Sequence, residues 1–293
     1  MKSLAVLITC HNRKEKTLQC LRNLYKAYEI NNGGFIISLY LTDDGCTDGT
    51  IEAILDEFLD RDITVLKGSG SLYWAGGMRR SWNEALKYKF EGYLMLNDDT
   101  LVFENVFEQI FEANLYSYNK YGKGGIYVGS TTNSEETSLT YGGSVFINKF
   151  LNTTVWLQPT DSYQECHLGN ANITYVSKDV VDKIGILHKS YIHSIADYDY
   201  TYNAYVNKMP LFILKGFQGI CEDDHQEDGY FKFNSLTLKE RIKFLYGPLG
   251  LEFKESLLFQ KRFFPYRYPI VFITAWFKVL FPKSYYKLNS LRN

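Results

Sequence analysis

Two neighbouring carboxylates, Asp98 and Asp99, follow Asn97 directly after the apolar run 93–96. Carboxylates at the end of a buried strand are costly unless a positive group lies against them. Hard oxygen ligands of this kind suit Mg²⁺ or Mn²⁺, and such ions often join one or two carboxylates to the phosphates of a substrate. The acidic pair therefore indicates a divalent cation together with a phosphate-bearing ligand.

A second acidic turn, Asp43–Gly45, follows another apolar run at 36–41. In open α/β sheets, ligands bind in the crevice outside the carboxyl ends of the strands. Two strands that each end in an acidic turn predict such a crevice and, with it, a nucleotide-dependent enzyme. The alternative is that both turns are structural: the turn at 97–99 would close a strand, and Asp43–Gly45 would cap a helix that begins at Thr50.

The elements that must position these turns alternate along the first 120 residues. Continuous apolar runs predict strands covered on both faces, at 4–8, 36–41, 63–66 and 93–96. Apolar residues at helical spacing predict helices at 14–28, 50–59, 81–90 and 104–118. This alternation predicts a Rossmann-like α/β fold with a mostly parallel sheet flanked by helices.

Beyond residue 120 the alternation weakens. Strands are expected near the sheet edge at 124–129 and 144–147, followed by a short strand and helix at 175–184, a helix at 198–206 and a strand at 211–214. No internal repeat or linker interrupts this part of the chain before about residue 235, so we expect one main domain with a helical, aromatic C-terminal extension.

The bulk composition excludes some classes of protein. The 293 residues carry 32 Lys+Arg and 33 Asp+Glu, which lacks the basic excess expected of a nucleic-acid-binding protein. The five cysteines show no C-x-x-C spacing, which indicates a reducing setting rather than a disulfide framework or a zinc site. The apolar stretch at 4–9 is too short for a signal peptide. We therefore expect a cytoplasmic protein.

Six segments, in order, carry a resemblance to a known family. Three resemble the signature blocks of family 2 glycosyltransferases, which are inverting enzymes of the GT-A fold: Leu7–Arg13, Asp43–Thr50 and Asn97–Asp99. Three more resemble later blocks of its bacterial rhamnosyltransferase-like members: Trp74–Arg79, Gly169–Asn170 and Asp197–Asp199. The resemblance implies a GT-A catalytic domain over residues 1–235, followed by the extension at 236–293. Within the domain it implies a nucleotide-sugar-binding half at 1–120 and an acceptor-binding half at 121–235.

The resemblance also implies roles on the donor side. Asp44 would accept the N3–H of a uracil or thymine, a charge-assisted hydrogen bond. Asp99 would bind the metal ion, and Asp98 would help to hold the metal or the ribose. His225, in an acidic run, would be a further metal ligand or else an incidental histidine in a solvated loop. The other donor-binding candidates are Thr9, Asn12, Gly76, Gly77 and Arg79.

On the acceptor side, Asp197 matches the family's general base, which takes a proton from the acceptor hydroxyl as that oxygen attacks the anomeric carbon. Asp199, Asn170 and Trp74 are the acceptor-binding candidates, and for Asp199 the alternative is a role in positioning its helix. For Asp197 the alternative is an acid favoured by the dipole at a helix N-terminus. Two positions depart from the family pattern: Asn97 stands where aspartate is usual, and Ala196 where glutamate is commoner.

The C-terminal extension holds an apolar stretch at 270–282 that Lys278 interrupts. It is shorter than the ~20 residues that a membrane span needs. Basic residues surround it: Lys261, Arg262, Arg267, Lys278, Lys283 and Lys287. This pattern favours a helix lying on the anionic inner face of a membrane. The alternative is a helix that packs on the catalytic domain or at a dimer contact.

Together these features predict an inverting hexosyltransferase that uses Mn²⁺ or Mg²⁺. It would move a sugar from a nucleoside-diphosphate donor, with UDP or dTDP as the nucleotide, to a hydroxyl of a glycan or lipid-linked oligosaccharide in bacterial cell-surface polysaccharide synthesis. A sugar-nucleotide nucleotidyltransferase is the enzymatic alternative, but it should show a Gly-rich basic loop where this chain has Thr9–Arg13. An inactive sugar-binding module is the other alternative, which the departures at Asn97 and Ala196 leave open.

Overall fold

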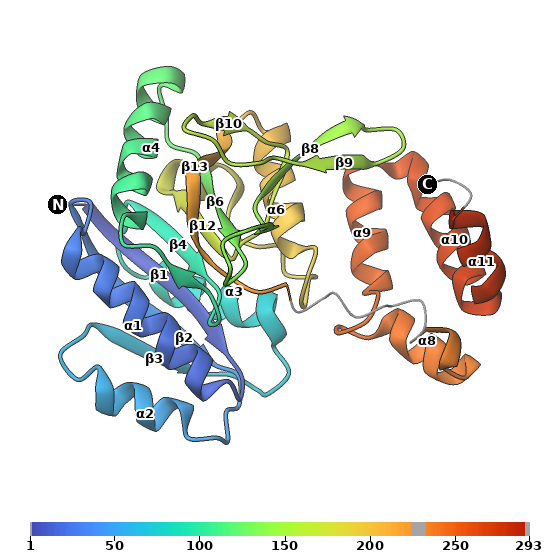
Figure 1. The fold of residues 1–293 in the computed structure, drawn as a ribbon, viewed down its shortest axis with the longest axis horizontal. Coiled ribbons are helices and arrows are strands. Elements are labelled where there is room, and N and C mark those ends of the chain that lie inside the picture. The colour runs from blue at the N-terminus through green and yellow to red at the C-terminus, as the bar shows by residue number, and fades with distance from the viewer. Residues whose placement is uncertain (1, 224–232, 291–293) are drawn as a thin grey trace. The chain divides into compact units, whose positions relative to one another are not determined.

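The structure is a computed structural model that describes residues 2–223 and 233–290 (Figure 1). The chain forms two compact units. Unit 1 comprises the chain up to Lys189 together with Ala196–Asp223, and unit 2 comprises Ser190–Ile195 together with the chain from residue 224 onward. The domain boundary expected at residue 235, and the halves expected within the catalytic domain, stay predictions.

Unit 1 is built on a ten-stranded sheet whose main path runs β10-β13-β6-β12-β4-β1-β2-β3. The long strands are β1 (Lys2–Cys10), β2 (Phe35–Asp43), β3 (Ile63–Lys67), β4 (Gly92–Leu96), β6 (Ile126–Thr132), β12 (Ile173–Ser177) and β13 (Leu211–Ile220). The short ones are β5 (Leu101–Val102), β7 (Leu139–Tyr141) and β10 (Gln164–Glu165). Strands β4, β1, β2 and β3 run parallel, whereas β12 is antiparallel to both β4 and β6. The predicted mostly parallel sheet is confirmed.

Helices cover both faces of this sheet. They are α1 (Lys14–Ile30), α2 (Thr50–Glu57), α3 (Tyr73–Ala85), α4 (Val106–Tyr121), α5 (Lys178–Ile184) and α6 (Ala196–Val206). Side chains alternate between the two faces of a strand, so Leu4, Val6 and Ile8 of β1 join one core with α1, α2 and α4. On the other face, the fully buried Trp82 of α3 contacts Tyr93 of β4 and Tyr200 of α6, with ring centroids 5.5 and 5.4 Å apart.

Of the two strands expected near the sheet edge, one belongs to another sheet. The other, expected at 124–129, is β6, which lies between β12 and β13, third from the β10 end of the main path. Its Gly129 marks close neighbours rather than an edge, because a Cβ there would lie 2.9 Å from Ile173 Cβ and 3.1 Å from Gln218 Cβ. The segment expected at 144–147 is β8 (Gly143–Asn148), which belongs to a separate three-stranded sheet with β9 (Thr153–Trp156) and β11 (Leu168–Gly169).

The expected helix at 81–90 is also wrong in its bounds, since α3 begins at Tyr73 and ends at Ala85. Gly76 and Gly77, which precede the expected helix, therefore lie inside α3. Gly77 permits a close contact between α3 and β1, because a Cβ at this position would lie 2.0 Å from Thr9 Oγ1. A side chain at position 77 would push α3 away from the sheet.

In unit 2 the described helices are α8 (Leu238–Tyr246), α9 (Phe253–Phe263), α10 (Tyr268–Leu280) and α11 (Pro282–Ser290), with a 3₁₀ turn at Pro265–Arg267. Thr237 and Glu240 form a capping box that starts α8. A small core of Phe233, Leu245, Phe253, Leu257 and Val279 holds the unit together. No helix among the described residues is both long and apolar enough to cross a membrane.

Candidate active site

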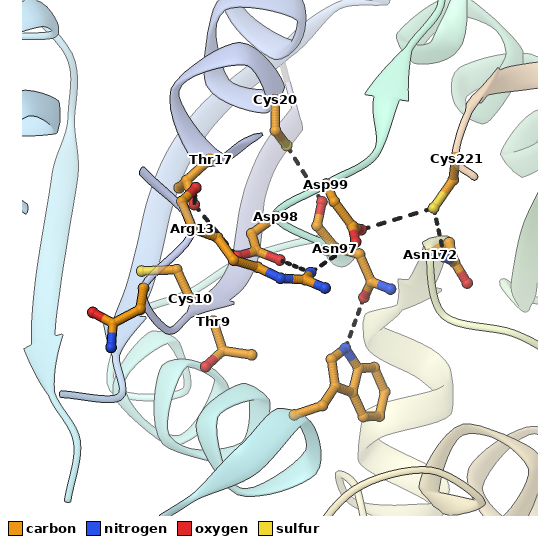
Figure 2. A network of polar contacts seen from close by, with 12 residues as sticks. Thr9, Cys10, Arg13, Thr17, Cys20, Asn97, Asp98, Asp99, Asn172 and Cys221 are labelled. Carbon is orange, nitrogen blue, oxygen red and sulfur yellow. Dashed lines mark hydrogen bonds and ion pairs between the residues drawn. The ribbon is translucent and has the colours of Figure 1, made fainter. Parts of the chain in front are cut away.

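The acidic pair lies in the turn after β4, beside the turn after β1. Arg13, which directly precedes α1, places Nη1 3.2 Å from Asp98 Oδ1 and 2.7 Å from Asp99 Oδ2. Figure 2 shows its guanidinium between the two carboxylates. Because β1 and β4 are neighbouring parallel strands, the turns that follow them meet at one edge of the sheet. The positive group expected against the pair is thus supplied by the chain itself, through a residue that sequence reasoning did not single out.

Asp98 is the more enclosed of the two acids, with 6% of the residue exposed. Thr17 of α1 donates a hydrogen bond from its hydroxyl to Asp98 Oδ2 at 3.3 Å. Burial raises the pKa of Asp98 to about 6, although the charge of Arg13 acts in the opposite direction. The side chain of Asp99 is 15% exposed, and among the described residues the donor to its Oδ1 is the weak thiol of Cys221, 3.8 Å away.

Asn97, the departure from the family motif, joins the acidic turn to α3. Its Oδ1 accepts a hydrogen bond of 2.7 Å from the indole Nε1 of Trp74. Its backbone carbonyl accepts one from the thiol of Cys20 at 3.3 Å, which Figure 2 also shows. The amide of Asn97 is therefore occupied in positioning Trp74, an expected acceptor-binding residue, whose ring is half-buried.

Asp98 and Asp99 could supply two of the ligands of a divalent cation, but not its full coordination. Their hard oxygens are the ligands that Mg²⁺ and Mn²⁺ prefer, and such ions commonly take one or two carboxylates and complete their coordination with water and substrate phosphates. No group of three or more His, Cys, Asp or Glu side chains that could hold a metal occurs among residues 2–223 and 233–290. His225, the expected additional ligand, lies outside the described residues.

Asp44 has a structural role that the sequence did not predict. Its Oδ1 accepts a hydrogen bond from Gly70 N at 2.8 Å, and its Oδ2 accepts bonds from Leu72 N at 2.8 Å and Tyr73 N at 3.0 Å. With 4% of the residue exposed, Asp44 binds the backbone that leads into α3. Asp44 does not cap the helix at Thr50: Gly49 is its N-cap, and Asp48 Oδ1 accepts from Thr50 N at 3.1 Å.

The remaining donor-side candidates lie in or near the same turns. Asn12 has φ 50° and accepts a hydrogen bond of 2.7 Å from Thr47 N, which ties the turn after β1 to the turn after β2. Thr9 and Gly77 are buried against each other, so neither offers an open surface to a ligand there. Gly76 is buried within α3.

Arg79, the arginine expected to contact the diphosphate, lies on α3 and is half-buried. Its Nη1 donates a hydrogen bond of 3.1 Å to the His188 carbonyl. Burial lowers the pKa of its guanidinium. Its contact with a diphosphate stays a prediction.

Asp197 stands in the first turn of α6, held by backbone and amide donors. Its Oδ1 accepts from Tyr198 N at 2.7 Å, and its Oδ2 accepts from Ala171 N at 3.2 Å and Asn170 Nδ2 at 3.4 Å. Burial raises the pKa of Asp197 to about 6, while these hydrogen bonds act against the rise. Asp199 is 1% exposed, which favours positioning of the helix over contact with an acceptor.

A single short segment links Asp197 to the acidic pair. Ala171 N donates to Asp197 Oδ2, and the carbonyl of the next residue, Asn172, accepts a 3.0 Å hydrogen bond from Asn97 N. Asn170 bonds Asp197 from the other side of Ala171. Residues 170–172, directly before β12, therefore contact both the Asp197 carboxylate and the backbone of the turn that carries Asp98 and Asp99.

Comparisons with known proteins bear on the fold. No family model matches the chain, and no curated protein matches it. Among solved structures, S. aureus TarS matches over 89% of this chain with a TM-score of 0.53 and 15% identity, and this chain spans only 42% of that TarS chain. TarS 1-349 in complex with UDP-GlcNAc matches with a TM-score of 0.53 and 12% identity, over 89% of this chain and 71% of that chain.

A third similar structure is the mannosyltransferase PcManGT from Pyrobaculum calidifontis in complex with GDP-Man and Mn²⁺. It has a TM-score of 0.50 and 11% identity, over 94% of this chain and 69% of that chain. At such identities the likeness establishes the fold and nothing finer. Unit 1, with its mostly parallel sheet flanked by helices, has the GT-A type of α/β fold.

Proposed function

We propose that this chain is an inverting glycosyltransferase that moves a hexose from a nucleoside-diphosphate sugar to a hydroxyl of a glycan. The observation that carries the proposal is that residues 170–172 hydrogen-bond both the Asp197 carboxylate and the backbone of Asn97, which directly precedes Asp98 and Asp99. A transferase needs a group that holds the donor diphosphate close to a base that activates the acceptor. The similar structures with bound UDP-GlcNAc and GDP-Man support a nucleotide-sugar donor.

In this proposal Asp197 accepts the proton of the acceptor hydroxyl as the oxygen attacks the anomeric carbon from the face opposite the diphosphate. Asn170 and the Ala171 backbone orient the carboxylate. Asp98 and Asp99 hold a Mn²⁺ or Mg²⁺ ion, which when bound offsets the diphosphate charge and supports departure of the nucleotide. Asp44 and Asn12 fix the turns that face the nucleotide, which we propose to be UDP or dTDP.

Calorimetry with UDP, dTDP and GDP, each with and without Mn²⁺, tests this function. We expect one of the nucleotides to bind in a metal-enhanced manner, and the matching sugar nucleotide to be hydrolysed slowly without an acceptor. Absence of metal-enhanced binding for all three would overturn the proposal. Release of pyrophosphate from a nucleoside triphosphate and a sugar phosphate would favour the nucleotidyltransferase alternative, and binding without hydrolysis or transfer would favour the inactive module.

We further propose that unit 2 rests on an anionic membrane and so brings the enzyme to a lipid-linked acceptor in bacterial polysaccharide synthesis. Residues 256–293 contain no Asp or Glu. Large apolar side chains on or directly after α10 are exposed: Ile270, Phe272, Ile273, Leu280 and Phe281. Apolar area together with basic charge is the combination that binds anionic interfaces.

Flotation with vesicles tests the membrane proposal. The protein should float with phosphatidylglycerol vesicles and remain behind with phosphatidylcholine vesicles, and Ile273→Glu should weaken flotation, because Ile273 is 65% exposed. The matched control is Leu59→Glu, at an exposed apolar position of unit 1. Equal behaviour with both lipids would overturn the proposal, and a dimer that Ile273→Glu dissociates would replace it.

A further inference from the structure

Arg13 holds the acidic pair in an unusual way, through a single nitrogen. Nη1 contacts one oxygen of Asp98 and one of Asp99, and the other guanidinium nitrogens bond no described residue. The Arg13 side chain is 42% exposed. This is not the parallel two-nitrogen fork that arginine forms with one carboxylate. It is a positive group placed between two carboxylates, where a bridging cation would also be placed.

Arg13 and a divalent cation need the same oxygen atoms. Two carboxylates and one guanidinium leave the turn with an excess negative charge that attracts a further cation. A Mg²⁺ ion binds its oxygens at about 2.0–2.1 Å, and Nη1 already lies 2.7 Å from Asp99 Oδ2. A cation on that oxygen would meet the guanidinium at close range, and the two positive charges would repel each other.

We propose that Arg13 competes with the divalent cation for Asp98 and Asp99, and that after yielding them it contacts the donor diphosphate. The second half of this inference rests on the proposed function. Without the donor, Arg13 holds the oxygens of Asp98 and Asp99 in the orientation that they have in this structure. When the donor is bound, the planar guanidinium of Arg13 suits the oxygens of its diphosphate. Because 42% of the Arg13 side chain is exposed, the guanidinium has room to move from the carboxylates to the phosphates.

Mn²⁺ binding to the donor-free protein, followed by electron paramagnetic resonance of the free ion, tests the competition. Arg13→Gln should bind Mn²⁺ roughly tenfold more tightly than the wild type, which is the size of a typical coupling between two sites. At saturating Mn²⁺ the same variant should bind the nucleoside diphosphate more weakly. The matched control is Arg22→Gln on α1, because Arg22 pairs with Glu57 and lies about two turns further along the chain from Arg13. It should change neither affinity.

Each half of the inference has its own contrary result. Unchanged Mn²⁺ affinity in folded Arg13→Gln overturns the competition. Tighter Mn²⁺ with unchanged nucleotide affinity overturns the contact with the diphosphate. If Arg13→Gln does not fold, the guanidinium ¹⁵N resonance of Arg13 in the wild-type protein decides: it should shift on Mg²⁺ addition, and a resonance unmoved at saturating Mg²⁺ overturns the competition. If the wild-type protein binds no nucleoside diphosphate, the proposed function is overturned. The Mn²⁺ affinities of the wild type and Arg13→Gln still test the competition in that case.

Discussion

Replacing Asp197 with asparagine is expected to lower the rate of glycosyl transfer by about 10²–10⁴-fold, the usual contribution of a general base. Donor binding should persist, because the bonds that hold Asp98 and Asp99 come from Arg13 and Thr17 rather than from α6. The measurement is kcat at saturating donor, together with the calorimetric Kd of the nucleotide. Asp182→Asn, at an exposed position of α5, is the matched control and should leave both values unchanged.

The pH dependence of the rate, compared between the wild type and Asn170→Ala, separates a base from an acid that merely starts a helix, because burial raises the pKa of Asp98 to about 6 as well. A base must be ionised, and burial raises the pKa of Asp197 to about 6. The rate should therefore be full well above pH 6 and fall as the pH drops through 6. Asn170→Ala removes a hydrogen bond that favours the ionised form, so it should move this fall to higher pH. Unchanged transfer in Asp197→Asn would remove Asp197 as the base.

The parts of the fold that the sequence predicted are those that depend on local apolar pattern. The runs at 4–8, 36–41 and 93–96 contain little but large apolar residues, and burial on both faces leaves such segments few alternatives to a central strand. The start of α3 was missed because its cause is not local. The carboxylate of Asp44, 28 residues before Leu72, accepts the first backbone donors of that helix.

The candidate site likewise has parts that the sequence predicted and parts that it did not. Its acids could be named from the sequence, because adjacent carboxylates after an apolar run and an acid at a helix start are visible along the chain. Their partners could not, since Arg13 is 85 residues from Asp98 and the Asn170 amide is 27 from Asp197. The order of strands in the sheet would have supplied the missing signal. Once β1 is known to lie beside β4, an arginine after one strand and acids after the other must meet.

Asp44→Ala is expected to destabilise the protein by ~3–5 kcal/mol. The change leaves three backbone N–H groups, those of Gly70, Leu72 and Tyr73, without the acceptor they have now. Each buried donor left unsatisfied costs about 1–3 kcal/mol, and the costs are not fully additive because water can reach some of them. The free energy of unfolding from urea denaturation is the measurement. Asp48→Ala removes a carboxylate that accepts from Lys14 N and Thr50 N, but Asp48 is exposed and water can replace these bonds, so this change should cost only about 1 kcal/mol.

The same variants show whether Asp44 also contacts the nucleobase. Its oxygens already accept three hydrogen bonds, and a carboxylate has about four acceptor positions, so one remains for an imide N–H. Asp44→Asn keeps one acceptor oxygen and should therefore lose less stability than Asp44→Ala. If Asp44 contacts the base, folded Asp44→Asn should still lose uridine-nucleotide affinity while keeping its affinity for Mn²⁺. If its nucleotide affinity stays at the wild-type value, Asp44 serves α3 alone. Wild-type stability in Asp44→Ala would contradict the structural role itself.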